Sequence, residues 1–92
     1  MTLTKNAILL LKDLIQIESF SKNEALTAKR LEKWFQNYNI PYNKRDNNLW
    51  AVNKTYNPSK PTLLLNSHHD TVFPNEAYTR DPFIAEIVDG KL

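Results

Sequence analysis

The run Thr62-Leu63-Leu64-Leu65-Asn66 constrains the fold more than any other part of this 92-residue sequence. It is a short, continuous apolar segment that follows a loop-forming stretch, residues 57–61, and leads directly into polar residues. Runs of this kind are typical of strands that are buried on both faces, as in a sheet covered by helices. We therefore expect residues 62–66 to form a central strand of a sheet.

Two helices are expected before this strand. In residues 5–17 apolar side chains recur at helical spacing, and Thr4 is a candidate N-cap. A second helix is expected to start at Ser21, because Ser21 and Glu24 have the spacing of a capping box. It should end near Ile40, because the residue before a proline avoids the helical conformation.

Turn signals place two further strands in the second half of the chain. Asp46-Asn47-Asn48 predicts a turn that leads into a strand at Leu49–Val52, and Asp89-Gly90 predicts a hairpin turn near the end of the sequence. The order of helix, helix, strand, loop and strand predicts an α/β fold with two helices packed on a sheet. Since the sequence stops two residues after Gly90, we expect residues 1–92 to be the N-terminal part of a longer protein.

The composition excludes several classes of function. Twelve basic and ten acidic residues give a net charge of +2, which is too small to indicate binding to nucleic acid. No run of ~18 apolar residues is present, so no membrane segment is expected. The absence of cysteine excludes disulfides and thiolate metal ligands. Lys12 and Asp13 interrupt the apolar run near the N-terminus and no signal-peptide cleavage site follows, so we expect a cytoplasmic protein.

His68 and Asp70 are the candidate site residues, because they follow the expected strand at the edge where α/β sheets carry functional groups. Alternation along an extended chain places them on one side and His69 on the other. A carboxylate that binds one ring nitrogen of a histidine leaves the other nitrogen free for a metal. The alternative is a surface histidine hydrogen-bonded to a neighbouring aspartate. A catalytic zinc takes three protein ligands, so other ligands must lie far away in the sequence or outside it.

The motifs around this pair resemble a known family. Ser67-His68-His69-Asp70-Thr71-Val72, Pro74, Asp81-Pro82-Phe83 and Asp89-Gly90-Lys91-Leu92 are together similar to the pattern of one group of zinc-dependent amidohydrolases and peptidases. This family includes acetylornithine deacetylase, succinyl-diaminopimelate desuccinylase, aminoacylase and carboxypeptidase G. The resemblance covers essentially all 92 residues and is strongest to the acetylornithine deacetylase group. Ser67 stands where the family usually has glycine, and Tyr78 lies near a common tryptophan position.

The resemblance implies the N-terminal segment of a zinc-exopeptidase-like catalytic domain, with two helices packed on a mixed sheet. It implies that His68 is a metal ligand, that Asp70 takes part in catalysis by holding His68, and that His69 has no role. The complete site would contain two zinc ions, with cobalt as a substitute, in a protein that forms a homodimer.

The implied reaction is removal of the acyl group from an N-acyl amino acid, with N-acetylornithine in arginine biosynthesis as the expected substrate. The alternatives are a metallo-dipeptidase or tripeptidase of the same family, and a non-catalytic binding domain with a structural His-Asp pair. Neither nucleic acid nor a membrane is an expected partner. Residues 1–92 alone are expected to be inactive, to bind zinc weakly and to expose an apolar surface.

Overall fold

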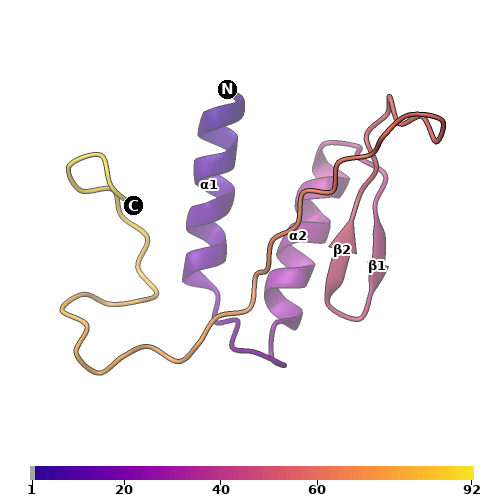
Figure 1. Cartoon of the computed structure of the whole chain (residues 1–92). Coiled ribbons are helices and arrows are strands. Elements are labelled where there is room, and N and C mark those ends of the chain that lie inside the picture. The colour runs from indigo at the N-terminus through magenta and orange to yellow at the C-terminus, as the bar shows by residue number, and fades with distance from the viewer. Residues whose placement is uncertain (1) are drawn as a thin grey trace.

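Two helices and one β-hairpin form the regular structure of the chain, of which a computed structural model describes residues 2–92. Helix α1 spans Leu3–Gln16 and helix α2 spans Ala25–Asn37. The hairpin consists of β1 (Asn43–Arg45) and β2 (Asn48–Trp50), and an extended segment then leads back past α2 (Figure 1). The chain is thus a small domain with two helices and a two-stranded antiparallel hairpin.

Helix α1 confirms the first predicted helix but starts two residues earlier. The predicted cap at Thr4 is wrong, because Thr4 lies inside the helix. Thr2 is the N-cap instead, and its Oγ1 accepts a hydrogen bond from the Lys5 N–H at 3.2 Å. Thr2 thereby satisfies one of the amides that the first turn of a helix leaves unpaired.

Helix α2 confirms the second predicted helix, but the predicted capping box is wrong. Glu24 occupies the N-cap position and makes no capping hydrogen bond with its side chain. Ser21 lies in the preceding loop, where its N–H donates to the carbonyl of Thr71 at 3.2 Å. A tertiary contact therefore takes the place of the local capping interaction that the sequence indicates.

The hairpin confirms the predicted turn and part of the predicted strand. Asn43 pairs with Trp50 and Arg45 with Asn48, so that Asp46 and Asn47 form a two-residue turn. Asp46 has a φ of 54°, a left-handed conformation that aspartate and asparagine tolerate better than most residues. The predicted strand at 49–52 ends early, at Trp50.

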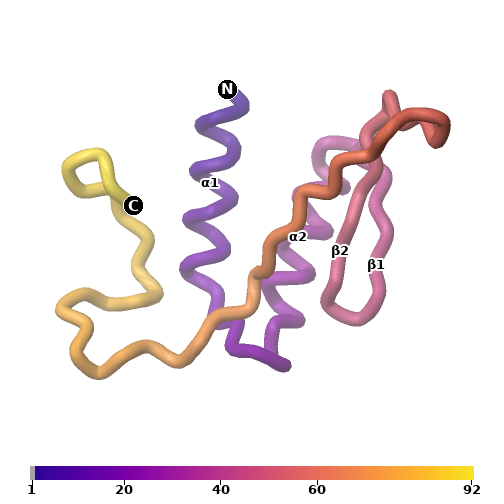
Figure 2. Tube along the Cα trace, viewed as in Figure 1, coloured from indigo at the N-terminus to yellow at the C-terminus, as the bar shows by residue number. Residues whose placement is uncertain are grey.

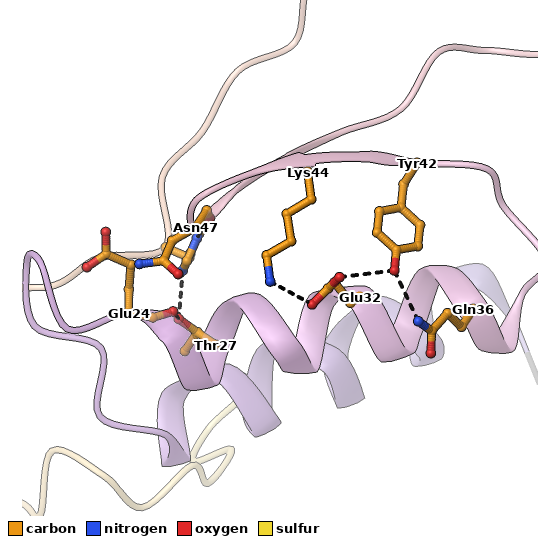
Figure 3. A network of polar contacts seen from close by, with 8 residues as sticks. Glu24, Thr27, Glu32, Gln36, Tyr42, Lys44 and Asn47 are labelled. Atoms are coloured by element: carbon orange, nitrogen blue, oxygen red, sulfur yellow. Dashed lines mark hydrogen bonds and ion pairs between the residues drawn. The ribbon is translucent and has the colours of Figure 1, made fainter.

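A row of polar contacts attaches the hairpin to α2 (Figure 3). Lys44 Nζ lies 3.0 Å from Glu32 Oε2, and the hydroxyl of Tyr42 donates to Glu32 Oε1 at 3.1 Å. Gln36 donates to the same hydroxyl at 3.0 Å. The ring of Tyr42 also stacks on Phe35, with their centroids 5.4 Å apart. These contacts fix the position of the hairpin along the helix.

The most deeply buried residues lie close to the start of α2. Ala28 and Thr27 have no exposed surface, and Ser19 retains only 2% of its own. Ala28 is the one fully buried apolar residue in the part of the chain that the structure describes. The interior of this domain is therefore small, and two of its three members are polar.

The run at residues 62–66 differs most from expectation. It is extended and crosses in front of α2 in the view of Figure 2, but it is assigned to no strand. No backbone hydrogen bond joins residues 62–68 to another segment within the described range 2–92. Exposure of Leu63, Leu64 and Leu65 is between 79% and 86%. The prediction of burial on both faces is therefore wrong for these residues.

The physical reason is that a strand is buried by partner strands and by layers on its faces, and residues 2–92 provide neither here. The predicted mixed sheet is accordingly not formed among them. The sheet that they form contains only the antiparallel pair β1 and β2. A single parallel bridge between Phe20 and Thr71 holds the far end of the extended segment. The expectation of an exposed apolar surface is confirmed.

The turn at Asp89 and Gly90 is confirmed. Val88 and Lys91 form an antiparallel bridge, and the two turn residues have φ values of 52° and 73°. Two consecutive positive φ angles are the signature of a type I′ hairpin turn, which glycine adopts without strain. None of the helices within residues 2–92 has the length and apolar character that a membrane crossing requires.

The exposed leucines predict self-association. An extended segment with unpaired backbone groups and apolar side chains pairs readily with another copy. We expect Leu64→Lys to weaken self-association at least about tenfold in sedimentation velocity, because a charge at an edge opposes pairing. Its effect on the free energy of unfolding should stay within about 0.5 kcal/mol, since Leu64 is exposed. Ala7→Lys, which adds the same charge on α1, is the control, and equal weakening by both variants would contradict this account.

Candidate metal-binding site

His68 and Asp70 form a close pair just beyond the extended segment. His68 Nδ1 lies 2.9 Å from Asp70 Oδ1 and 3.0 Å from the backbone carbonyl oxygen of the same residue. The two side chains therefore lie on the same side of the chain, as the alternation of an extended backbone predicts. The expected pairing is confirmed, and the role of His68 as a metal ligand remains a prediction.

The two acceptors define which ring nitrogen of His68 carries the proton. A carboxylate oxygen and a carbonyl oxygen can only accept, so Nδ1 must be the donor in both contacts. In neutral His68 the lone pair is consequently on Nε2. The side chain of His68 is 82% exposed, so this nitrogen is open to an incoming ligand. This is the tautomer that a metal-binding histidine with a carboxylate partner adopts.

The pair also changes the pKa of both groups. Hydrogen bonds to the backbone carbonyl and the carboxylate of Asp70 raise the pKa of His68, and the negative charge of Asp70 adds to the effect. The hydrogen bond from His68 lowers the pKa of Asp70, and a further one from Ser21 acts in the same direction. Both shifts favour the charged forms, so the carboxylate is available to orient the ring.

His69 points to the opposite side and binds two other elements. Its Nδ1 lies 2.6 Å from Thr27 Oγ1 on α2, and its Nε2 lies 2.9 Å from the backbone carbonyl oxygen of Asn47 in the hairpin turn. Figure 3 shows Thr27 and Asn47 at this end of the row of contacts along α2. Because a carbonyl only accepts, Nε2 carries a proton. In neutral His69 the Nδ1 lone pair then accepts the hydroxyl proton of Thr27, for which the backbone carbonyl of Glu24, at 3.0 Å from Thr27 Oγ1, is the other acceptor. His69 thus has no free nitrogen for a metal.

Backbone contacts fix the same short segment. Ser19 Oγ donates to the carbonyl of His69 at 2.8 Å, and the Thr71 N–H donates to the carbonyl of Ser19 at 2.7 Å. The Ser21 N–H completes the set by donating to Thr71, as described above. Residues 69–71 are therefore held firmly against the loop between the helices, whereas residues 62–68 are not.

The contacts of His69 could not be predicted from the sequence. The identity of Thr27 and Asn47 as partners depends on how α2 and the hairpin pack, which no local pattern shows. The alternation along the strand did place His69 on the side opposite His68. The side of the extended segment on which His69 lies is the side that faces α2, so its ring can contact Thr27.

An open trough of about 630 Å³ lies beside the His68–Asp70 pair, with walls from α1, α2, β2 and residues 66–70. Glu24 also lines it, and Glu24 Oε2 is buried without a hydrogen-bond partner within the described range. Nevertheless, no group of three or more histidine, aspartate or glutamate side chains in residues 2–92 is arranged to hold a metal ion. Within the described residues the His68–Asp70 pair alone therefore does not make up the three protein ligands that a catalytic zinc takes.

Comparisons of the chain with models of protein families, with curated proteins and with solved structures found no match.

From the pKa shifts of His68 and Asp70 we predict how the stability of the fold depends on pH. The raised pKa of His68 means that its stabilising contribution is complete below the ordinary value of 6.5 and is lost as pH rises through the folded value. The lowered pKa of Asp70 means that its contribution is present above 3.8 and is lost as pH falls through the folded value. The pair should stabilise the fold most between these two ordinary values.

Asp70→Asn tests this assignment. We expect the pKa of His68 in an NMR titration to return toward its ordinary value, because the amide removes the charge and the carboxylate acceptor. Asp81→Asn, a change of the same kind outside the pair, serves as the control. An unchanged pKa of His68 in Asp70→Asn would show that the carboxylate does not act on the ring.

Proposed function

We propose that this chain supplies one histidine ligand, with its orienting carboxylate, to the active site of a zinc-dependent amidohydrolase of the acetylornithine deacetylase kind. The observation that carries the proposal is the hydrogen bonding of His68. Asp70 holds Nδ1 protonated, so that an exposed Nε2 presents its lone pair. The resemblance of residues 67–74, 81–83 and 89–92 to the motifs of that family is a second, independent support.

The donor fits the metal in kind, because neutral imidazole nitrogen is a common zinc ligand. His68 would bind zinc through Nε2, and Asp70 would keep the ring oriented and make it a stronger donor. Bound zinc ions would supply Lewis acidity, which activates water and polarises an amide carbonyl. Since His68 is one ligand only, the proposal requires further ligands and a general base from polypeptide beyond the residues described.

The proposed substrate is an N-acyl amino acid, with N-acetylornithine as the first compound to test. The Ser-His-His-Asp-Thr-Val sequence at residues 67–72 supports this choice within the family. The proposal includes the zinc-exopeptidase-like fold, with residues 1–92 as the N-terminal segment of its catalytic domain. It also includes a cytoplasmic location and a homodimer. The alternative within the same family is a metallo-dipeptidase or tripeptidase, which would use the same zinc chemistry on a peptide bond.

A second candidate is a non-catalytic binding domain in which the His68–Asp70 pair is structural. The observation that favours it is that no third metal-binding side chain joins the pair within residues 2–92. The exposure of His68 counts against it, because a pair whose only purpose is to stabilise the fold gains little when it faces solvent.

His68→Ala tests the proposal. Zinc content and hydrolysis of N-acetylornithine are measured on the protein as the cell produces it, with and without the substitution. We expect the bound zinc to fall by at least one ion per site and hydrolysis to fall more than about 100-fold, because a ligand to the catalytic metal is lost. Thr4→Ala, an exposed change on α1, is the matched control.

Three results have distinct meanings in this experiment. Loss of zinc and activity in His68→Ala alone supports the proposal. Unchanged zinc content and activity in that variant would overturn the ligand assignment. Zinc binding with activity on dipeptides and none on N-acetylornithine would replace the deacetylase with the peptidase.

A further inference from the structure

The side chain of His69 connects three parts of the chain that are far apart in sequence. It lies on the segment after the extended run, and its partners Thr27 and Asn47 precede it by 42 and 22 residues. Thr27 has no exposed surface, so the contact at 2.6 Å is shielded from water. A shielded hydrogen bond is costly to leave unmade, and this gives the ring of His69 one strongly preferred position.

The position of the His69 ring determines the direction in which the side chains of His68 and Asp70 point. In an extended chain, side chains on either side of a residue point away from the face that it uses. With His69 directed toward α2 and the hairpin, His68 and Asp70 are both directed to the outer side. The hydrogen bonds of Ser19 with the His69 carbonyl and the Thr71 N–H hold the peptides that follow His69, and the ring adds its own contacts to α2 and the hairpin turn.

The His68–Asp70 contact needs this backbone geometry. His68 Nδ1 reaches both the carboxylate and the main-chain carbonyl of Asp70, at 2.9 Å and 3.0 Å. On the acceptor side, the second contact depends on the peptide orientation at residue 70 and not on the rotamer of the Asp70 side chain. Because His68 is largely exposed, no packing around its own ring holds it in place. The constraint must come from the chain on which it lies.

We infer that His69 is a positioning residue, whose imidazole joins α2 to the hairpin turn and thereby holds the backbone that presents His68 and Asp70. Its importance for metal binding rests on the function proposed above, whereas its effect on the geometry of the pair does not. Two adjacent histidines thus hold opposite tautomers. His68 is protonated on Nδ1 with Nε2 free, and His69 is protonated on Nε2 with Nδ1 bound to Thr27.

The test compares His69→Ala and Thr27→Val with the unchanged chain by nitrogen NMR of the imidazoles, well above the ordinary histidine pKa. In the unchanged chain we expect the two histidines to show opposite tautomers. In both variants the Nδ1–H form of His68 should fall from the major to the minor form, because the backbone no longer holds the acceptors in place. The dissociation constant for Zn²⁺ alone should rise about tenfold, as for the loss of other residues that orient a metal ligand.

Two further variants show that the effect comes from positioning. His69→Gln retains an N–H that reaches the Asn47 carbonyl and should restore part of the Nδ1–H population. Thr4→Val, the same substitution at an exposed site on α1, should leave His68 and Zn²⁺ binding unchanged. Circular dichroism of each variant reports whether the helices remain.

The outcomes separate this inference from the proposed function. An unchanged tautomer of His68 in a folded His69→Ala or Thr27→Val variant overturns the inference. If both variants unfold, the tautomers measured in the unchanged chain test the inference. Finding the same tautomer on His68 and His69 there also overturns it. If the tautomer of His68 shifts in the variants while Zn²⁺ does not bind the unchanged chain, the inference stands and the metal site proposed above fails.

Discussion

The hydrogen bonds that hold residues 69–71 against the inter-helix loop and α2 are the constraint on which the rest of this structure depends. Ser19, Ser21 and Thr27 provide them, and Ser19 and Thr27 are among the few buried residues. Polar groups in so small an interior must be paired, because an unpaired buried donor or acceptor costs about 1–3 kcal/mol. The pairing of these buried polar groups therefore fixes residues 69–71 in one position.

The consequences extend to both sides of the chain. On the inner side His69 joins α2 to the hairpin, which the contacts of Glu32 with Tyr42 and Lys44 also attach to this helix. On the outer side the largely exposed His68 meets the half-buried Asp70, and a contact that solvent reaches contributes little to stability by itself. The fold therefore delivers a prepared imidazole at the rim of an open trough.

The helices and turns were predictable from the sequence because their causes are local. Helical spacing of apolar residues located α1 and α2, and Asp46-Asn47 and Asp89-Gly90 located the turns. The same rule of alternation predicted that His68 would meet Asp70. The caps at Thr4 and Ser21 were wrong, since Thr2 was an equally good cap and since Thr71 binds the Ser21 amide.

What failed depended on contacts between distant parts of the chain. Leu63, Leu64 and Leu65 have the composition of a central strand, but the described residues supply no partner strand and leave them exposed. The partners of His69 could not be read from its neighbours, because they are set by how α2 and the hairpin pack.

We propose that Nε2 of His68 is the nitrogen through which this chain binds a metal. The most direct measurement follows the nitrogen signals of both histidines while Zn²⁺ is added. The account predicts that His68 Nε2 shifts, that His68 Nδ1 keeps its proton, and that both nitrogens of His69 remain unchanged. A shift of His69, or of His68 Nδ1 in place of Nε2, would contradict it.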